Sequence, residues 1–211
     1  MAQKSNVWDA LAKKYDGLWV QKYSLAPTRR AVKHALTSFF HKPNGVLLDL
    51  GCGTGQLLCE LGEESSGLTL FGIDKSAQMT RAAQAKETGA TFFCLDIDEE
   101  DLPGQLRENA LDVLVCCHSF PYYKDKPAVL AKLFKALRAG GVLLFAQAST
   151  NNLYDRLVLS IVERTAEPAN YLSRKDFRAL VSPFFTVKHE FVVRERFFMP
   201  SICGFVLEKR L

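Results

Sequence analysis

Short, continuous apolar runs alternate with amphipathic segments through the middle of the chain. The runs are largely apolar and cover residues 46–50, 68–74, 91–95, 111–117 and 142–146. Between them, apolar residues recur at helical spacing, so the pattern predicts repeated strand and helix units. Because the runs are apolar throughout, not only at every second position, both faces of the sheet are expected to be covered, as in a parallel sheet flanked by helices.

The amphipathic segments predict helices that start at residue 56 and extend over 77–89 and 127–137. The last of these places its apolar side chains on one face and is followed by Gly140 and Gly141. Two glycines in this position are typical of a helix end. Residues 45–148 are therefore expected to form an alternating α/β core.

The N-terminal part and a late segment interrupt this alternation. Residues 1–41 have helical apolar stripes, and we interpret them as a helical lid. Residues 151–182 are predicted to form two helical pieces, separated near Pro168, that cover the substrate. In this insertion, Tyr154, Leu157, Ile161 and Tyr171 either form an apolar pocket wall or pack as ordinary helix residues.

The C-terminal part, 185–211, contains two predicted strands, 185–193 and 202–207, joined by a turn near Pro200. With the five strands of the core they make seven. The 211 residues are thus expected to form a single α/β domain. Its sheet is predicted to be seven-stranded and mostly parallel, with an antiparallel edge strand and helices on both faces.

The composition restricts the classes of partner. The formal net charge is +4, from 27 Lys and Arg against 23 Asp and Glu, which is too small for the basic surface of a nucleic-acid-binding domain. No apolar run reaches the ~20 residues that span a bilayer, and the first residues do not resemble a secretory signal. The six cysteines include no Cys-x-x-Cys pair. We expect a cytoplasmic protein with free thiols and no metal site.

A glycine-rich loop follows the first predicted strand. Gly51, Gly53 and Gly55 stand between that strand and a helix, where glycine allows unusual backbone angles and close approach of a ligand. A dinucleotide-binding loop would have its third glycine at position 56, which is Gln56. Asp49, two residues before the loop, is placed to receive a ligand ammonium group or to brace the loop.

Acidic residues end the next two predicted strands. Asp74 follows the first glycine by the spacing at which an acid binds a ribose diol, although a helix N-cap is an alternative role. Asp96 is placed to accept a hydrogen bond from an adenine amino group while Ile97 packs on the ring. Since parallel strands end at one edge of the sheet, these acids are expected to converge there.

Residues 46–55 resemble the first motif of class I S-adenosylmethionine-dependent methyltransferases. Similar matches continue at 72–79, 95–97, 111–115 and 137–144. The resemblance implies a Rossmann-like sheet whose last strand is inserted antiparallel. It also implies S-adenosylmethionine as the cofactor, with contacts from Asp49, Gly51, Cys52, Gly53, Gly55, Asp74, Lys75, Met79, Asp96, Ile97 and Cys117.

Methyl transfer from a sulfonium is an in-line displacement that depends on positioning. His118, after the fourth strand, is the candidate general base, with a polar wall residue as the alternative. Tyr15 resembles the lid tyrosine of small-molecule methyltransferases, where its ring faces the sulfonium; packing within the lid is the alternative. The predicted function is methyl transfer to a small molecule by a monomer or homodimer. A protein or RNA acceptor, or cofactor binding without catalysis, are the alternatives.

Overall fold

The computed structural model describes residues 7–64, 67–163, 167–194 and 199–210. The first six residues of the expected lid and residues 164–166 of the expected cover lie outside these ranges. The strands are β1 Gly45–Leu50, β2 Leu68–Asp74, β3 Thr91–Cys94, β4 Leu111–Cys117, β5 Leu137–Ala148, β6 Phe185–Val193 and β7 Ile202–Lys209.

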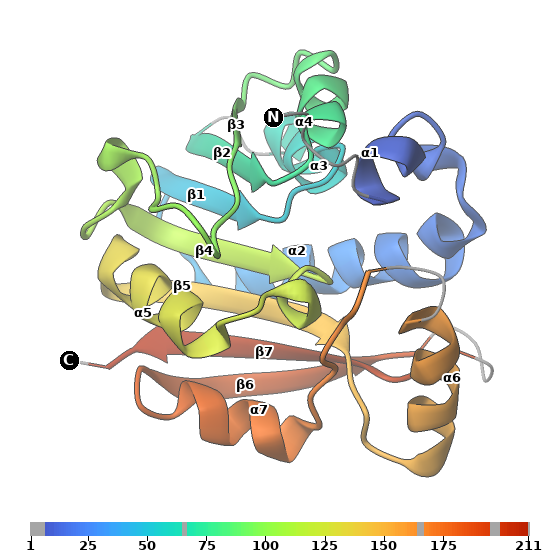
Figure 1. The fold of residues 1–211 in the computed structure, drawn as a ribbon. Helices are drawn as coiled ribbons and strands as arrows, with labels where there is room; N and C mark the ends of the chain where they lie inside the picture. Colours follow the sequence, from blue (N-terminus) through green and yellow to red (C-terminus); the bar gives the residue numbers. More distant parts are fainter. Residues whose placement is uncertain (1–6, 65–66, 164–166, 195–198, 211) are drawn as a thin grey trace.

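These strands form one sheet in the order β3-β2-β1-β4-β5-β7-β6 (Figure 1). The strands β1 to β5 run parallel to one another. In contrast, β7 is antiparallel to both β5 and β6. The expected antiparallel strand is therefore β7, inserted between β5 and the edge strand β6. The arrangement confirms the mostly parallel seven-stranded sheet and places the carboxyl ends of β1–β5 at one edge.

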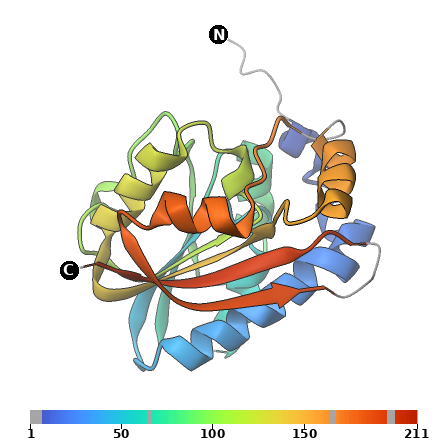
Figure 2. The same ribbon diagram turned by 90° about the horizontal axis from the view of Figure 1, so that it is seen from below.

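Helices cover both faces of this sheet. They are α1 Val7–Leu11, α2 Ala26–Phe39, α3 Gln56–Glu64, α4 Ala77–Gln84, α5 Lys126–Ala136, α6 Leu153–Glu163 and α7 Arg174–Val181. One core contains residues of α2, α3 and α4, and the other contains residues of α5 and α7. Figure 2 shows β6 and β7 running between α7 and α2.

The central strand β4 shows why residues 113–117 are all apolar and do not alternate with polar residues. Leu114 and Cys116 belong to the core under α5 and α7, whereas Val113 and Val115 belong to the core under α2 and α3. All four side chains are completely buried. Since burial of each large aliphatic side chain contributes about 1.5–3 kcal/mol, both faces of the strand stabilise the three-layer fold.

The glycine pair expected to end the helix at 127–137 has another role. α5 ends at Ala136, and β5 begins at the next residue. The pairing of β4 with β5 then skips from Leu137 to Val142. Gly140 has φ +72°, and a Cβ on Gly141 would lie 2.5 Å from the side chain of Leu137. The glycines therefore allow a tight excursion within the strand.

The helix expected over 77–89 is shorter than predicted. α4 ends at Gln84, and Glu87 and Gly89 have φ values of +49° and +74°. Such left-handed residues cannot continue a right-handed helix. The chain turns there toward β3.

In each of the two helical segments outside the α/β core, residues 7–41 and 151–182, one part packs on the sheet and the other lies at its carboxyl edge. α2 packs on the sheet with Val32 and Leu36 buried, so the lid consists of the described residues before it. These include α1, the 3-10 turn Tyr15–Gly17 and the π-helix Gln21–Leu25. Similarly, α7 packs on the sheet, and α6 stands at the carboxyl edge (Figure 1). No helix within the described ranges combines the length and apolarity needed to cross a bilayer.

Candidate active site

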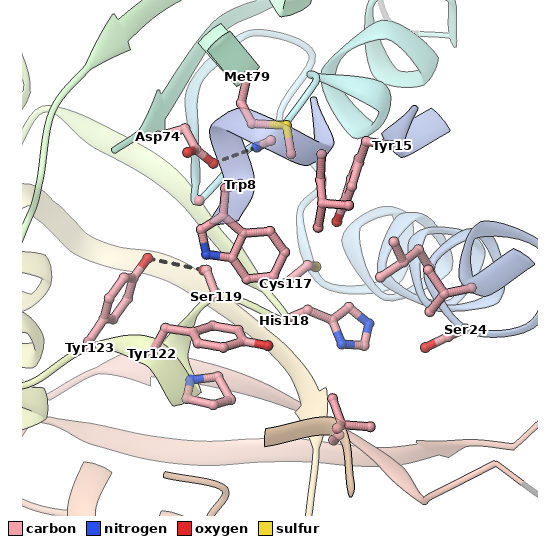
Figure 3. Close-up of a pocket in the computed structure, with 18 of the residues that line it drawn as sticks. Trp8, Tyr15, Ser24, Asp74, Met79, Cys117, His118, Ser119, Tyr122 and Tyr123 are labelled. Atoms are coloured by element: carbon pink, nitrogen blue, oxygen red, sulfur yellow. Dashed lines mark hydrogen bonds between the residues drawn. The ribbon is translucent and has the colours of Figure 1, made fainter. Parts of the chain in front are cut away.

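A cavity of about 450 Å³ lies at the carboxyl ends of the parallel strands (Figure 3). Its walls come from the glycine loop, the ends of β2, β3 and β4, the N-terminal lid, α6 and the loop before β7. The sites predicted from the sequence that line it are Tyr15, Gly51, Gly53, Asp74, Lys75, Met79, Asp96, Ile97, Cys117 and His118.

The glycine loop is held against the neighbouring strand β2. The amides of Gly51 and Cys52 both donate to the carbonyl of Ile73, at 2.7 and 3.0 Å. Gly51 has φ +76°, and a Cβ there would lie 2.2 Å from the Cβ of Ser119. Glycine is required at this position both for the backbone angle and for the close approach of the loop after β4.

Asp74 connects the end of β2 to the glycine loop. Its Oδ2 accepts from the amide of Gly53 at 2.8 Å, and its Oδ1 accepts from the amide of Ser76 at 2.9 Å. The N-cap of α4 is Ser76, whose hydroxyl accepts from Met79 N. Burial raises the pKa of Asp74, and the two amide hydrogen bonds oppose that rise. Asp74 thus presents a partly buried, oriented carboxyl group at the cavity wall.

Asp49 lies at the end of β1 and does not line the cavity. Only 3% of it is exposed, and its Oδ1 has no hydrogen-bond partner. Burial, followed by the charge of Asp74, raises the pKa of Asp49 to about 7. Since a buried carboxyl without a partner is costly, the base of the site favours a positively charged ligand.

Cys52 and Gly55 also lie away from the cavity wall. The Cys52 side chain belongs to the core between the sheet and α3, and its Sγ would lie 2.9 Å from a Cβ on Gly72. A Cβ on Gly55 would lie 3.0 Å from Ala83. Both residues therefore shape the loop through packing. Neither of them lines the cavity in which the sequence predicted that they would contact the cofactor.

One end of the cavity lies next to β2, β3 and α4. Met79, Asp96 and Ile97 line it together, and Ile97 and Met79 are almost fully buried. Lys75 also lines the wall, but its ammonium is paired with Glu167, in the segment after α6. Lys75 therefore links the end of β2 to the cover of the cavity.

The lid is attached to the sheet edge through acidic side chains. Asp9 accepts from the hydroxyl of Ser76 at 2.5 Å, and Asp16 accepts from the hydroxyl of Thr54 at 2.5 Å and from Lys86 at 2.7 Å. Between them, the ring of Tyr15 would lie 3.7 Å from a Cβ on Gly53. Burial raises the pKa of Tyr15, so its phenol is neutral. Tyr15 thus covers the glycine loop from the lid side.

His118 follows β4 with φ +61°, an uncommon angle for a residue other than glycine. Its amide donates to Ala146 O at 2.8 Å, and its Nε2 lies 3.0 Å from the hydroxyl of Thr28. That hydroxyl donates its own hydrogen to Ser24 O. Thr28 must therefore accept from Nε2–H, which leaves Nδ1 with its lone pair. Burial lowers the pKa of His118 to about 4, so the ring is neutral near pH 7.

The loop after β4 carries a polar network that the sequence pattern did not reveal. The hydroxyl of Tyr123 donates to Ser119 Oγ at 3.0 Å, and Ser119 donates to Leu50 O at 2.9 Å. Lys126 is buried and donates to the carbonyls of Pro121 and Tyr123. These bonds hold the loop against β1 and thereby position its residues in the wall.

The face of α6 that lines the cavity is not the one that carries the wall residues considered in the sequence analysis. Tyr154, Leu157 and Ile161 are 40%, 63% and 55% exposed, which contradicts a role in the wall. Instead, α6 lines the cavity with Val158, Leu159 and Val162. Tyr171, the fourth predicted wall residue, does line the cavity. Apolar residues occur all around α6, so periodicity alone could not show which face is buried.

Comparisons with known proteins agree with this geometry. A family model described as a methyltransferase domain matches residues 48–143. The trans-aconitate 2-methyltransferase of Deinococcus radiodurans is 32% identical over 102 residues, which are 48% of this chain and 37% of that protein. The chain spans 37–54% of the length of the first curated relatives that it matches.

The chain contains a class I S-adenosylmethionine-dependent methyltransferase domain. A chain described as a methyltransferase, in complex with the Trm112 methyltransferase activator of Haloferax volcanii, has the same fold. It aligns with TM-score 0.79 and 19% identity over 98% of this chain and 100% of its own. The magnesium protoporphyrin IX methyltransferase of Synechocystis, solved with S-adenosylhomocysteine, aligns with TM-score 0.71 and 19% identity over 97% and 95%.

S-adenosylmethionine is the cofactor of this methyltransferase domain. The residues at the carboxyl edge fit its chemistry. Asp49 is buried and Asp74 is partly buried, and the charge of Asp74 acts on Asp49. Two acids so placed suit a ligand with a sulfonium and an ammonium group. The glycine loop leaves room for close approach of that ligand to the backbone.

Proposed function

We propose that this methyltransferase domain transfers a methyl group to a small-molecule acceptor bound in the same cavity. The supporting observation is that the cavity continues from the cofactor residues past His118 to walls made by α6, Tyr171 and Met199. Residues of both the lid and α6 line this continuation. A small acceptor fits such a site better than a segment of a folded macromolecule. We expect the protein to act as a monomer or homodimer without nucleic acid.

In this proposal, different predicted residues contact different parts of the cofactor. Asp74 accepts hydrogen bonds from the ribose hydroxyls, while Asp96 and Ile97 contact the adenine. The glycine loop holds the methionine part, with Asp49 beneath it as the acid nearest to the ammonium group. The ring of Tyr15 lies over the loop and favours the positive charge of the sulfonium.

When bound, S-adenosylmethionine supplies a methyl group on a positively charged sulfur. The protein contributes by holding the acceptor in line, for which effective molarities on the order of 10⁵ M are available. Thr28 keeps the hydrogen of His118 on Nε2, so Nδ1 is the atom that accepts a hydrogen from the acceptor. A neutral imidazole is sufficient here because a hydroxyl becomes a strong acid as it is methylated.

The test is transfer of a radioactive methyl group from S-adenosylmethionine into small-molecule, protein and RNA fractions of a cell extract. We expect label in the small-molecule fraction. His118→Asn is expected to reduce the rate by about 10²-fold or more with unchanged cofactor affinity, since the residue lies at the end of β4, beyond the residues assigned to the cofactor. Label confined to protein or RNA would contradict the small acceptor, and cofactor binding without any transfer would contradict catalysis.

A further inference from the structure

The cavity has a cofactor side and an acceptor side, which follow from the strand order. The cofactor residues belong to the ends of β1, β2 and β3, on one side of β4. Beyond β4 the wall is formed by Ala148 at the end of β5, by α6, and by Met199 and Pro200 before β7. Cys117 and His118, at the end of β4, lie between the two sides (Figure 3).

Apolar side chains dominate the acceptor side. α6 contributes the side chains of Val158, Leu159 and Val162. The lid adds Leu18, Trp19, Val20 and Leu25 to the lining of the same cavity. Pro121 and Met199 complete this wall. A ligand with a large apolar body would bury its surface here, at about 25 cal/mol for each Å² removed from water.

Charges on the cavity wall are unfavourable for an anionic ligand. Among the described residues that line the cavity, Lys75 is the one lysine or arginine, and its ammonium is paired with Glu167. Asp74, Asp96 and Asp98 line the cofactor side. A carboxylate on the acceptor would therefore lose its hydration without meeting an available cation on these walls, which is costly.

Few polar groups are present on the acceptor side, and they are close together. The hydroxyls of Tyr122 and Tyr171 lie 3.3 Å apart, and the Tyr122 ring packs edge-on against Trp8, with ring centroids 5.2 Å apart. His118 offers Nδ1 as an acceptor in its neutral form. A largely apolar site with a small number of placed polar groups recognises an apolar molecule with one polar end.

We infer that the methyl acceptor is an uncharged, mainly apolar molecule whose nucleophile is a hydroxyl or thiol group, and this rests on the proposed function. The lone pair of that oxygen or sulfur forms the new bond to the methyl carbon. The bond between the methyl carbon and the cofactor sulfur breaks, and its electron pair stays on the sulfur. The hydrogen of the nucleophile passes to Nδ1 of His118 and then to solvent.

The test compares matched ligands on the protein loaded with S-adenosylhomocysteine. The pairs are 4-butylphenol with 4-(4-hydroxyphenyl)butanoate, 1-octanol with 8-hydroxyoctanoate, and 1-octanethiol with 8-mercaptooctanoate. Within each pair the polar nucleophile is kept and a carboxylate is added. Calorimetry is expected to give dissociation constants at least about tenfold lower for the neutral members.

A pair of variants on one helix tests the location. Val158→Lys adds a cation to the cavity wall and is expected to shift the preference toward the carboxylates by about tenfold. Leu157→Lys adds the same charge to the exposed face of α6 and is expected to leave the preference unchanged. Measurements of thermal unfolding and of affinity for S-adenosylhomocysteine test whether both variants are folded.

The outcomes separate this inference from the proposed function. Failure to bind S-adenosylhomocysteine would contradict the proposed function itself. Binding of the cofactor product together with equal or tighter binding of the carboxylates, or with no binding of any neutral member, overturns only the apolar acceptor. Equal responses of Val158→Lys and Leu157→Lys would also overturn it.

Discussion

Two acidic residues, the buried Asp49 and the partly buried Asp74, determine the electrostatics at the base of the cavity. Asp74 is held by two backbone amides, whereas Oδ1 of Asp49 has no hydrogen-bond partner. Ionisation of Asp49 is disfavoured because its carboxyl is buried and because the charge of Asp74 acts on it. A cationic ligand relieves this cost, so cofactor affinity is expected to depend on both residues in different ways.

Asp74→Ala is expected to weaken S-adenosylmethionine binding at least about tenfold, or about 1.4 kcal/mol. The substitution removes the oriented carboxyl that we assign to the ribose and frees the amide of Gly53. Calorimetry measures the dissociation constant, with Asp101→Asn as a control because Asp101 is an exposed acid away from the wall. An unchanged constant for Asp74→Ala would rule out the ribose assignment.

The Asp49 pKa of about 7 predicts a pH dependence of binding and of stability. The ionised form favours the cofactor ammonium, so affinity is expected to rise with pH through about 7. For the unliganded protein the sign is opposite. Because the pKa is raised on folding, the contribution of Asp49 to stability is full below pH 3.8 and is lost as the pH rises through about 7.

Asp49→Asn removes the carboxyl that titrates, so it should abolish its contribution to the pH dependence of both affinity and stability. Comparison with the natural protein then separates this contribution from those of other titrating groups. The affinity of the variant should lose its rise near pH 7. Its free energy of unfolding, compared with that of the natural protein, should increase between about pH 4 and pH 7 by up to about 4 kcal/mol. Urea unfolding at several pH values measures this difference, and parallel pH curves for the two proteins would argue against a titrating Asp49.

Among the elements, the lid and α6 bring residues to the site that the α/β core does not contain. The lid is held by Asp9 at the start of α4 and by Asp16 at the glycine loop. α6 is joined to the opposite wall through the pair of Lys75 with Glu167, just after the helix. These contacts cross the cavity edge, so each should oppose loss of bound cofactor.

Asp16→Ala is expected to weaken cofactor binding several-fold, mainly through faster dissociation. The variant loses the hydrogen bond from Thr54 and the ion pair with Lys86, and a partly exposed pair of this kind contributes about 1 kcal/mol or less. Stopped-flow fluorescence of the lid tryptophans measures the dissociation rate. Lys14→Ala, an exposed neighbour in the lid, is the control, and equal rates in the two variants would show that the lid contact does not retain the cofactor.

At the scale of the whole molecule, segments that are distant in the sequence form the cavity walls at one edge of a continuous sheet. Lid, glycine loop, α6 and the loop before β7 meet at the carboxyl edge, and the two cores lie on opposite faces of the same strands. Ligand binding should therefore stabilise the domain as one unit.

We expect the protein to unfold in a single cooperative transition that shifts as a whole with ligand. At S-adenosylhomocysteine concentrations of about 100 times the dissociation constant, the free energy of unfolding should rise by about 2.7 kcal/mol. Calorimetric scans with and without ligand measure the shift. Two separate transitions, of which only one moves, would contradict a single domain.

The strand positions, the glycine loop and the ends of β2 and β3 could be predicted from the sequence because each depends on neighbouring residues. A buried strand between two helical layers needs apolar side chains on both of its faces, and β4 shows this with Val113 and Leu114 facing different cores. Gly51 needs a positive φ, and Asp74 ends a strand. Such local requirements leave a readable pattern.

The structure alone decided which groups face one another. The hydrogen on the His118 ring depends on Thr28, 90 positions earlier, and the low pKa of His118 depends on burial by the assembled fold. α6 is apolar on both sides, so packing selected Val158 over Leu157 for the cavity wall. Hydrogen-bond partners and solvent exposure arise from contacts between distant segments, and no periodicity within one segment records them.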